Sequence, residues 1–310
     1  MKFEYSDDNK RYHTLNYHLK NKFGGKIYKA VIDAGFSCPN IDGAVSRGGC
    51  AFCLGGSGAF THSGSITEQL ANEQKRLTAK YGKPQKMIAY FQAHTNTYAP
   101  VEVLNAKYGE ALSFPDVCGL AIATRPDCID DKTSACLQKL SEQTYLTVEL
   151  GLQTVFDKTA NGFNRGYGFA CFEDTFLKLK NAGIRVCVHM IDGLYGETPE
   201  MMLDTAKKVG LMYPDAVKIS LLHILRGTEY EKLYHSGKYT PLSKDDYIDI
   251  VCSQIALLPP ECVIERVTGD GAKADLIAPA WSINKISVLG GIDKKMAERN
   301  IYQGSEFTNY

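Results

Sequence analysis

The sequence predicts an α/β protein that folds as a partial (β/α)6 barrel of the TIM type. Apolar runs rich in β-branched and aromatic residues recur along the chain, and amphipathic segments with helical spacing separate them. Most runs are continuous rather than alternating, as in parallel strands that are covered on both faces. Strands that alternate with helices favour a parallel sheet with right-handed crossovers. An open, doubly wound sheet is the alternative topology.

The individual elements follow from these runs. We predict strands at residues 26–33, 86–93, 117–124, 145–154, 185–194 and 216–224, with a seventh at 261–269. The clearest helices are expected at 67–82 and 198–213, and the segment 243–259 is also helix-like. The second opens with Thr198 as N-cap and Pro199 at the first helical position. We therefore divide the chain into a basic N-terminal arm (1–25), a barrel (26–270) and a C-terminal extension (271–310).

The composition of the chain limits the classes of protein to which it can belong. The chain has 310 residues, a formal net charge of zero and 44% hydrophobic residues, and no apolar run approaches the roughly 20 residues that span a membrane. Its first residues show no apolar signal segment, so we expect a cytoplasmic protein without membrane association. Residues 1–30 hold seven Lys or Arg against three Asp or Glu, a net charge of +4. This arm contacts phosphate groups or is simply a solvated start of the chain.

Three cysteines share one loop after the first strand. The segment "CPNIDGAVSRGGCAFC" places Cys38, Cys50 and Cys53 with the spacing C-x11-C-x2-C. Its glycines and Pro39 favour a shaped loop rather than a helix. Clustered thiols in a reducing compartment indicate a metal site, whereas the other seven cysteines are scattered along the chain. The carboxyl ends of parallel strands, where this loop lies, are the usual ligand-binding edge.

Two metal centres fit this loop. Zinc would take the three thiolates and a fourth ligand such as His62, although structural zinc usually draws on two paired knuckles. A [4Fe–4S] cluster held by three cysteines would leave one iron open to bind another molecule. The single C-x-x-C with one distant cysteine favours the iron–sulfur cluster, and zinc remains the alternative.

Polar residues stand at the ends of successive predicted strands. The segments are "IATRPD" (122–127), "VELGLQT" (148–154), "NGFNRGY" (161–167) and "HMIDGLYGET" (189–198). Glu149 lies in an otherwise apolar strand and would be costly to bury without partners, which a ligand or a buried ion pair can supply. Because strand faces alternate with period two, Gln153 is expected on the same face as Glu149.

Taken together, the cysteines and these four segments resemble the radical S-adenosylmethionine (radical SAM) superfamily. The order of "TRPD", "ELGLQ" and "NRG" is similar to that in the group around the Elongator catalytic subunit, and the resemblance spans about residues 25–270. The tail segments "WSINK" and "YQGS" resemble the YhcC/YtqA (MnmL)-like branch. Two features depart from the superfamily pattern: its common spacing is C-x3-C-x2-C, and "FQAHTNTYAP" (91–100) stands where a GGEP-like segment is usual.

The resemblance implies a [4Fe–4S] cluster on Cys38, Cys50 and Cys53, and S-adenosylmethionine (SAM) bound to its open iron. Electron transfer into the sulfonium then releases a 5′-deoxyadenosyl radical, so the cofactors carry the hard chemistry and the protein orients the reactants.

The resemblance also implies candidate SAM contacts on successive strand ends. Arg165 is expected to pair with the carboxylate of SAM, and Glu149 with its ribose. Gln153, on the same strand face as Glu149, is a further candidate for binding the cofactor. Arg125 is expected to satisfy Glu149 or to face substrate, and Asp192 to contact adenosine or act as a polar brace. Backbone near Gln92 is the candidate partner of the SAM amino group.

Substrate and partners follow from the same resemblance. The Elongator-like domain acts at position five of the tRNA wobble uridine, and the branch implies conversion of 5-carboxymethylaminomethyl-uridine to 5-aminomethyl-uridine. The expected partners are tRNA, which the arm and Lys285, Lys294, Lys295 and Arg299 would contact, and an electron donor such as flavodoxin or ferredoxin. The alternative function is a zinc-stabilised, non-catalytic RNA-binding or scaffold protein.

Overall fold

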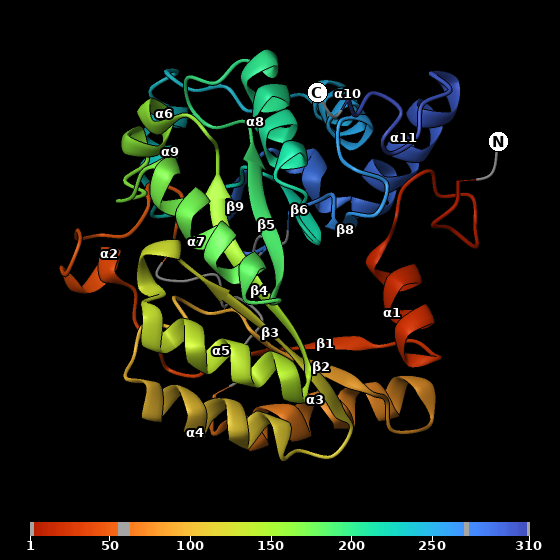
Figure 1. Ribbon diagram of the computed structural model, residues 1–310. Coiled ribbons are helices and arrows are strands. Elements are labelled where there is room, and N and C mark those ends of the chain that lie inside the picture. Colours follow the sequence, from red (N-terminus) through yellow and green to blue (C-terminus); the bar gives the residue numbers. More distant parts are fainter. Residues whose placement is uncertain (1–2, 55–62, 270–272, 309–310) are drawn as a thin grey trace.

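A computed structural model describes residues 3–54, 63–269 and 273–308. Seven parallel strands form one curled sheet in the order β1-β2-β3-β4-β5-β6-β8 (Figure 1). Neighbours in the sheet thus follow the order of the chain, which is the arrangement of a half-barrel and excludes a doubly wound sheet. The partial barrel is confirmed, with the seventh predicted strand as part of it.

The strands lie close to their predicted positions. Their bounds are Tyr28–Ile32 (β1), Met87–Phe91 (β2), Val117–Thr124 (β3), Tyr145–Gln153 (β4), Arg185–Asp192 (β5), Ala216–Leu221 (β6) and Val263–Arg266 (β8). Several predicted strands extend a few residues too far. The sixth run ends at Leu221, and Ile224–Leu225 (β7) instead pairs antiparallel with Leu276–Ala278 (β9). The chain leaves the sheet between the end of β6 at Leu221 and the start of β7 at Ile224.

Helices such as α3, α4, α5, α7 and α8 cover the outer face of the sheet (Figure 1). The helices of the described chain are Leu15–Phe23 (α1), Pro39–Asp42 (α2), Ile66–Tyr81 (α3), Val101–Leu112 (α4), Asp131–Gln143 (α5), Asp157–Gly162 (α6), Phe169–Asn181 (α7), Pro199–Leu211 (α8), Glu229–His235 (α9), Lys244–Ala256 (α10) and Lys285–Glu298 (α11). Local signals set their ends: Ser65 and Glu68 form a capping box at α3, and the Thr198 side chain accepts a hydrogen bond from the Met201 amide at α8. Among the described residues no helix is long and apolar enough to cross a membrane.

The two faces of the sheet differ in chemistry. On the outer face, Val148, Leu150 and Leu152 of β4 pack with apolar residues of α7 such as Phe172 and Phe176 in the main core. The period of two turns the intervening residues of each strand toward the concave side. There the strands carry polar and charged residues, which form the site described below.

The chain ends close the half-barrel at its open edge. The arm before α1 adds a single parallel bridge from Thr14 to Ile264 of β8. Helix α11 packs on α10, and the main chain of Gln303 donates a hydrogen bond to the Arg11 carbonyl (2.9 Å). The segment 273–308 is thus packed against both the arm and the barrel.

Candidate active site

A cavity of about 620 Å³ opens at the carboxyl ends of the strands. Cys38, Cys50 and Cys53 all line it from the loop after β1. Of the predicted SAM contacts, five line the same cavity, from β2, β3, β4 and the segment before α7: Gln92, Arg125, Glu149, Gln153 and Arg165. The structure therefore brings the thiol loop and the motif residues of successive strands to one place.

Two asparagines fix the thiol loop to the segment between α6 and α7. The fully buried amide of Asn40 donates to the main-chain oxygens of Asn164 (2.6 Å) and Arg165 (3.1 Å). In return, the Asn164 side chain donates to Ser46 Oγ (2.5 Å) and the Gly49 oxygen (2.9 Å). The "NRG" segment thus positions the cysteine loop. Sequence reasoning missed Asn40, because an asparagine in a glycine-rich loop looks like a turn residue.

The three thiols of the loop can serve as metal ligands. The three cysteines are half-buried and none forms a disulfide. Burial raises the pKa of the Cys50 thiol to about 11, so this thiol stays protonated until a metal displaces the proton. Among the described residues, no three side chains of His, Cys, Asp or Glu lie close enough together to hold a metal ion in their present positions. Three thiols that face one cavity nevertheless match the donor set of a [4Fe–4S] cluster with one open iron. His62, the candidate fourth zinc ligand, lies outside the described residues.

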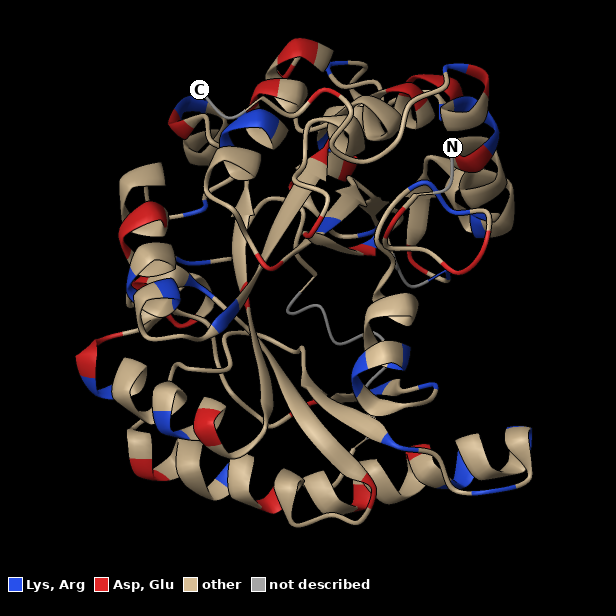
Figure 2. Cartoon of the chain, turned by 45° about the vertical axis from the view of Figure 1, so that its right-hand side comes forward, with Lys and Arg blue, Asp and Glu red and all other residues tan. Residues whose placement is uncertain are grey.

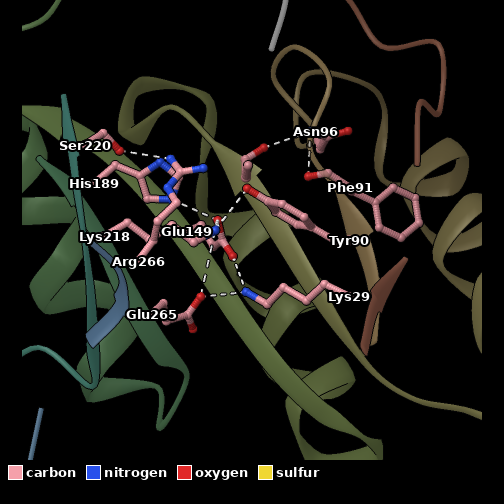
Figure 3. Close-up of polar contacts among 11 residues, drawn as sticks. Lys29, Tyr90, Phe91, Asn96, Glu149, His189, Lys218, Ser220, Glu265 and Arg266 are labelled. Carbon is pink, nitrogen blue, oxygen red and sulfur yellow. Dashed lines mark hydrogen bonds and ion pairs between the residues drawn. The ribbon is translucent and has the colours of Figure 1, made fainter. Parts of the chain in front are cut away.

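A buried network of charges lies on the concave side of the sheet (Figure 3). Glu149 accepts from Lys29 Nζ (2.8 Å), His189 Nε2 (2.8 Å) and Lys218 Nζ. Lys29 also pairs with Glu265 (2.6 Å). The partners of Glu149 come from β1, β5 and β6, and Lys29 extends the network to Glu265 of β8.

The network keeps Glu149 ionised. Burial opposes its ionisation, but the ammonium groups of Lys218 and Lys29 outweigh burial and lower the pKa of the carboxyl well below its ordinary value. Burial also lowers the pKa of His189, so a neutral imidazole donates to the carboxylate. The buried ion pair, one of the two alternatives for Glu149, is therefore present, and the carboxylate still lines the cavity.

Arg125 does not contact Glu149, which corrects one prediction. Its guanidinium instead pairs with both oxygens of Asp127 (2.9 and 2.7 Å) and donates to the Arg165 oxygen (2.9 Å). The ring of Tyr167 lies 4.8 Å from the guanidinium carbons of both Arg125 and Arg165. The short Arg-Pro-Asp turn after β3 brings the carboxylate of Asp127 next to the guanidinium of Arg125. The carboxylate of Glu149 is instead already paired with lysines.

Arg165 is fully buried and binds the protein itself. It donates to three main-chain oxygens, those of Leu152 (2.6 Å), Thr154 (2.7 Å) and Tyr167 (2.9 Å), and to Asp157 (3.0 Å). These contacts hold the end of β4 against the next loop. A pairing with the SAM carboxylate stays a prediction, and in this structure the guanidinium acts as a brace.

The two remaining candidates, Gln153 and Asp192, differ in whether they line the cavity. Gln153 lines the cavity, although its φ of 64° and a register shift between Gly151 and Gln153 end the regular alternation of β4. Asp192 falls on the opposite face of β5 from the cavity-lining His189 and Ile191. It is buried and accepts from Gln254 of α10 (2.7 Å). In this structure Asp192 acts as a polar brace, and a contact with adenosine stays a prediction.

The comparisons with known proteins agree with this geometry. Residues 45–209 match the model of the radical SAM superfamily, and residues 214–298 match the radical SAM C-terminal domain. The chain is 49% identical to the uncharacterized protein YtqA of Bacillus subtilis over 98% of this chain and 95% of that protein. It is 36% identical to protein YhcC of Escherichia coli over 93% and 92%.

Elongator complex protein 3 is a more distant relative. The mouse protein is 31% identical over 53% of this chain and 30% of its own length. The solved archaeal Elp3 of Methanocaldococcus infernus superposes with a TM-score of 0.66 at 19% identity, covering 89% of this chain and 65% of that one. Methylornithine synthase shares the fold at a TM-score of 0.50 and 14% identity, over 93% and 86% of the two chains. This chain belongs to the radical SAM superfamily, whose members use a [4Fe–4S] cluster and SAM.

Proposed function

We propose that this chain holds a [4Fe–4S] cluster on Cys38, Cys50 and Cys53, cleaves SAM and modifies the wobble uridine of tRNA. The observation that carries the proposal is the single cavity that joins the three thiols to the motif residues of β2, β3 and β4. The cluster supplies the electron that splits SAM and yields a 5′-deoxyadenosyl radical. The protein supplies the enclosed binding site and the orientation of the two reactants.

Residues of the cavity wall are suited to bind a nucleoside cofactor. Glu149 is ionised at neutral pH, so it can accept hydrogen bonds from the ribose hydroxyls. Arg125, held by Asp127 and the Tyr167 ring, places a cation beside the thiol loop. Gln92 and Gln153 add amide groups to the same wall. These roles are part of the proposal.

For the substrate we propose conversion of 5-carboxymethylaminomethyl-uridine to 5-aminomethyl-uridine. The methylene carbon of the carboxymethyl group, next to the secondary amine, gives a stabilised radical when it loses a hydrogen atom to the 5′-deoxyadenosyl radical. Transfer of one further electron to a one-electron carrier of the flavodoxin or ferredoxin type, with loss of the amine proton, gives an imine. Addition of water to the imine frees the primary amine and releases the two-carbon unit as glyoxylate. The likeness to Elongator complex protein 3 over half of this chain, and the 49% identity to YtqA over 98% of it, support this choice.

Ion pairs within the protein engage several of the basic residues that were expected to contact tRNA. Figure 2 shows acidic and basic residues interspersed over the helices. In the tail, Lys295 and Arg299 both pair with Asp249 (2.8 and 3.0 Å), and Lys294 lies 3.7 Å from Glu298. In the first thirty residues, Lys29 belongs to the buried network. Several basic side chains of the arm and the tail are therefore already paired within the protein. We expect fewer contacts with tRNA phosphates than the number of Lys and Arg in the sequence suggests.

The cluster assignment is tested by replacing single cysteines. We expect Cys50→Ala to abolish formation of 5′-deoxyadenosine in anaerobically reconstituted, reduced protein, because one thiolate ligand is lost. Cys252→Ala, in the buried core of α10, should leave it intact. Retained cleavage in Cys50→Ala would refute the assignment. A colourless protein with one zinc per chain would support the alternative of a non-catalytic RNA-binding or scaffold protein.

The substrate is tested separately. Reduced protein is incubated with SAM and tRNA that carries the carboxymethylaminomethyl group, and the nucleosides are analysed by mass spectrometry. We expect the wobble nucleoside to lose the two-carbon unit in step with 5′-deoxyadenosine. If 5′-deoxyadenosine forms while the nucleoside keeps its mass, the substrate is wrong and SAM cleavage stands.

A further inference from the structure

The side chain of Asn40 touches the thiol loop at one of its sulfurs. Its Nδ2 lies 3.6 Å from Cys50 Sγ, within hydrogen-bonding distance for sulfur, and the asparagine is completely buried. The same nitrogen donates to the oxygens of Asn164 (2.6 Å) and Arg165 (3.1 Å), so its two hydrogens serve three acceptors and the contact with the sulfur shares one of them. A nitrogen with three acceptors around it must be the donor end of the amide, so the orientation of the side chain is fixed.

The surroundings hold this amide in place. A Cβ atom added to Gly166 would lie 2.8 Å from Asn40 Oδ1, so the oxygen end packs directly against the main chain of the "NRG" segment. Asn40 lies in the first turn of α2, two residues after Cys38. The amide can neither flip nor swing away without breaking contacts on both sides.

We propose that Asn40 sets the reduction potential of the cluster through its N–H···S contact with Cys50, in addition to holding the loop. This inference rests on the proposed cluster ligands. A reduced cluster carries one more electron, much of it shared with the sulfurs, so an N–H dipole aimed at a ligand sulfur stabilises the reduced form more than the oxidised form. Hydrogen bonds to sulfur and the burial of the cluster are known determinants of its potential. Asn40 is thus a positioning residue that would make a cluster on these cysteines easier to reduce.

Asn164 provides a matched control, because it holds the same loop without touching a sulfur. Its side chain binds Ser46 and Gly49. Since its φ is 62°, Asn164→Gly removes those contacts while glycine accepts the backbone conformation. Loss of Asn164 therefore loosens the loop only, whereas loss of Asn40 removes the dipole at the sulfur as well.

The experiment is a redox titration of reconstituted full-length protein, followed by electron paramagnetic resonance, for the unchanged chain, Asn40→Ala, Asn40→Ser and Asn164→Gly. Iron and sulfide content is measured in each sample. We expect the Asn40 variants to show a more negative midpoint potential, with the ratio of reduced to oxidised cluster about tenfold lower at a fixed potential, or ~59 mV for one electron. Asn164→Gly should keep the potential and lose cluster more readily.

The outcomes separate this inference from the proposed function. A full iron and sulfide content with an unchanged potential in the Asn40 variants would overturn the role of Asn40 and leave the cluster assignment standing. The role is also overturned if neither Asn40 variant assembles a cluster while Asn164→Gly does, because Asn40 would then serve assembly alone. Absence of iron and sulfide from the unchanged chain would instead refute the proposed function itself.

Discussion

At the scale of single residues, Arg165 shows how a polar motif can serve the fold. Its guanidinium satisfies three main-chain oxygens and Asp157. A buried acceptor that loses its partner costs about 1–3 kcal/mol, so we expect Arg165→Ala to lower the free energy of unfolding by about 3 kcal/mol or more. Urea unfolding at neutral pH measures the change. A role as SAM ligand alone would lower SAM affinity without this loss of stability.

An exposed ion pair supplies the control for Arg165. Lys178 Nζ lies 2.8 Å from Asp131 on the surface, and exposed pairs contribute about 0–1 kcal/mol. Lys178→Ala should therefore shift the urea midpoint little. If Arg165→Ala shifts the midpoint no more than Lys178→Ala does and still loses SAM binding, Arg165 is a ligand and the bracing role is wrong.

The role of a residue was predictable where its partners are close in the sequence, and was not where they are far apart. The thiol loop was visible because its three cysteines lie within sixteen residues. Glu149 was singled out correctly as a charge that needs partners, yet those partners, Lys29 and Lys218, lie 120 and 69 residues away. No local pattern joins them, because only the curling of the sheet brings strands β1, β4 and β6 together across its concave side.

At the scale of elements, Asp192 links strand β5 to helix α10. Burial raises the pKa of its carboxyl to about 7, and the nearby Glu197 adds to this, although the hydrogen bond from Gln254 opposes it. The fold therefore favours the neutral acid. The stability that this group contributes is complete below pH 4 and is lost as the pH rises toward 7.

Asp192→Asn tests this pH dependence, because the amide keeps the shape of the acid and carries no charge. A pKa difference of about three units corresponds to about 4 kcal/mol. We expect the variant to gain stability relative to the unchanged chain from pH 4 up to pH 7, with a constant difference above pH 7. Urea unfolding at pH 5, 6, 7 and 8 measures it, and Asp131→Asn on the surface is the control. A pH-independent difference would contradict the raised pKa.

The elements themselves were largely predictable from sequence. The predicted strands at 117–124 and 145–154 match β3 and β4 to within one residue, because continuous apolar runs are bounded by turn residues. The error at residues 222–224 arose because an apolar run does not reveal that its last residues leave the sheet for β7. The face on which Asp192 lies also depends on the register of β5, which a strand end alone does not fix.

At the scale of the whole molecule, the parallel sheet was predictable from the alternation of strands and helices, whereas that alternation left a doubly wound order open and gave no sign of the closure of the chain ends. Gln303 lies near the end of the chain and is completely buried. Its amide donates to the oxygens of Pro259 (2.6 Å) and Cys262 (2.7 Å), and its oxygen accepts from the His13 amide (2.8 Å). One side chain thus joins the arm, the approach to β8 and the tail. A glutamine in a polar tail carries no sequence signal for this role.

We therefore expect Gln303→Ala to destabilise the whole barrel. Three buried main-chain groups would lose their partners at about 1 kcal/mol or more each, a total of about 3 kcal/mol. The arm would also be released, so limited proteolysis should cut it before the barrel unfolds. Glu306→Ala, three residues further along and exposed, is the matched control and should leave both the urea midpoint and the cleavage pattern unchanged. If the two variants behave alike, the tail is an attachment that the barrel does not need, and the closure by Gln303 contributes nothing to stability.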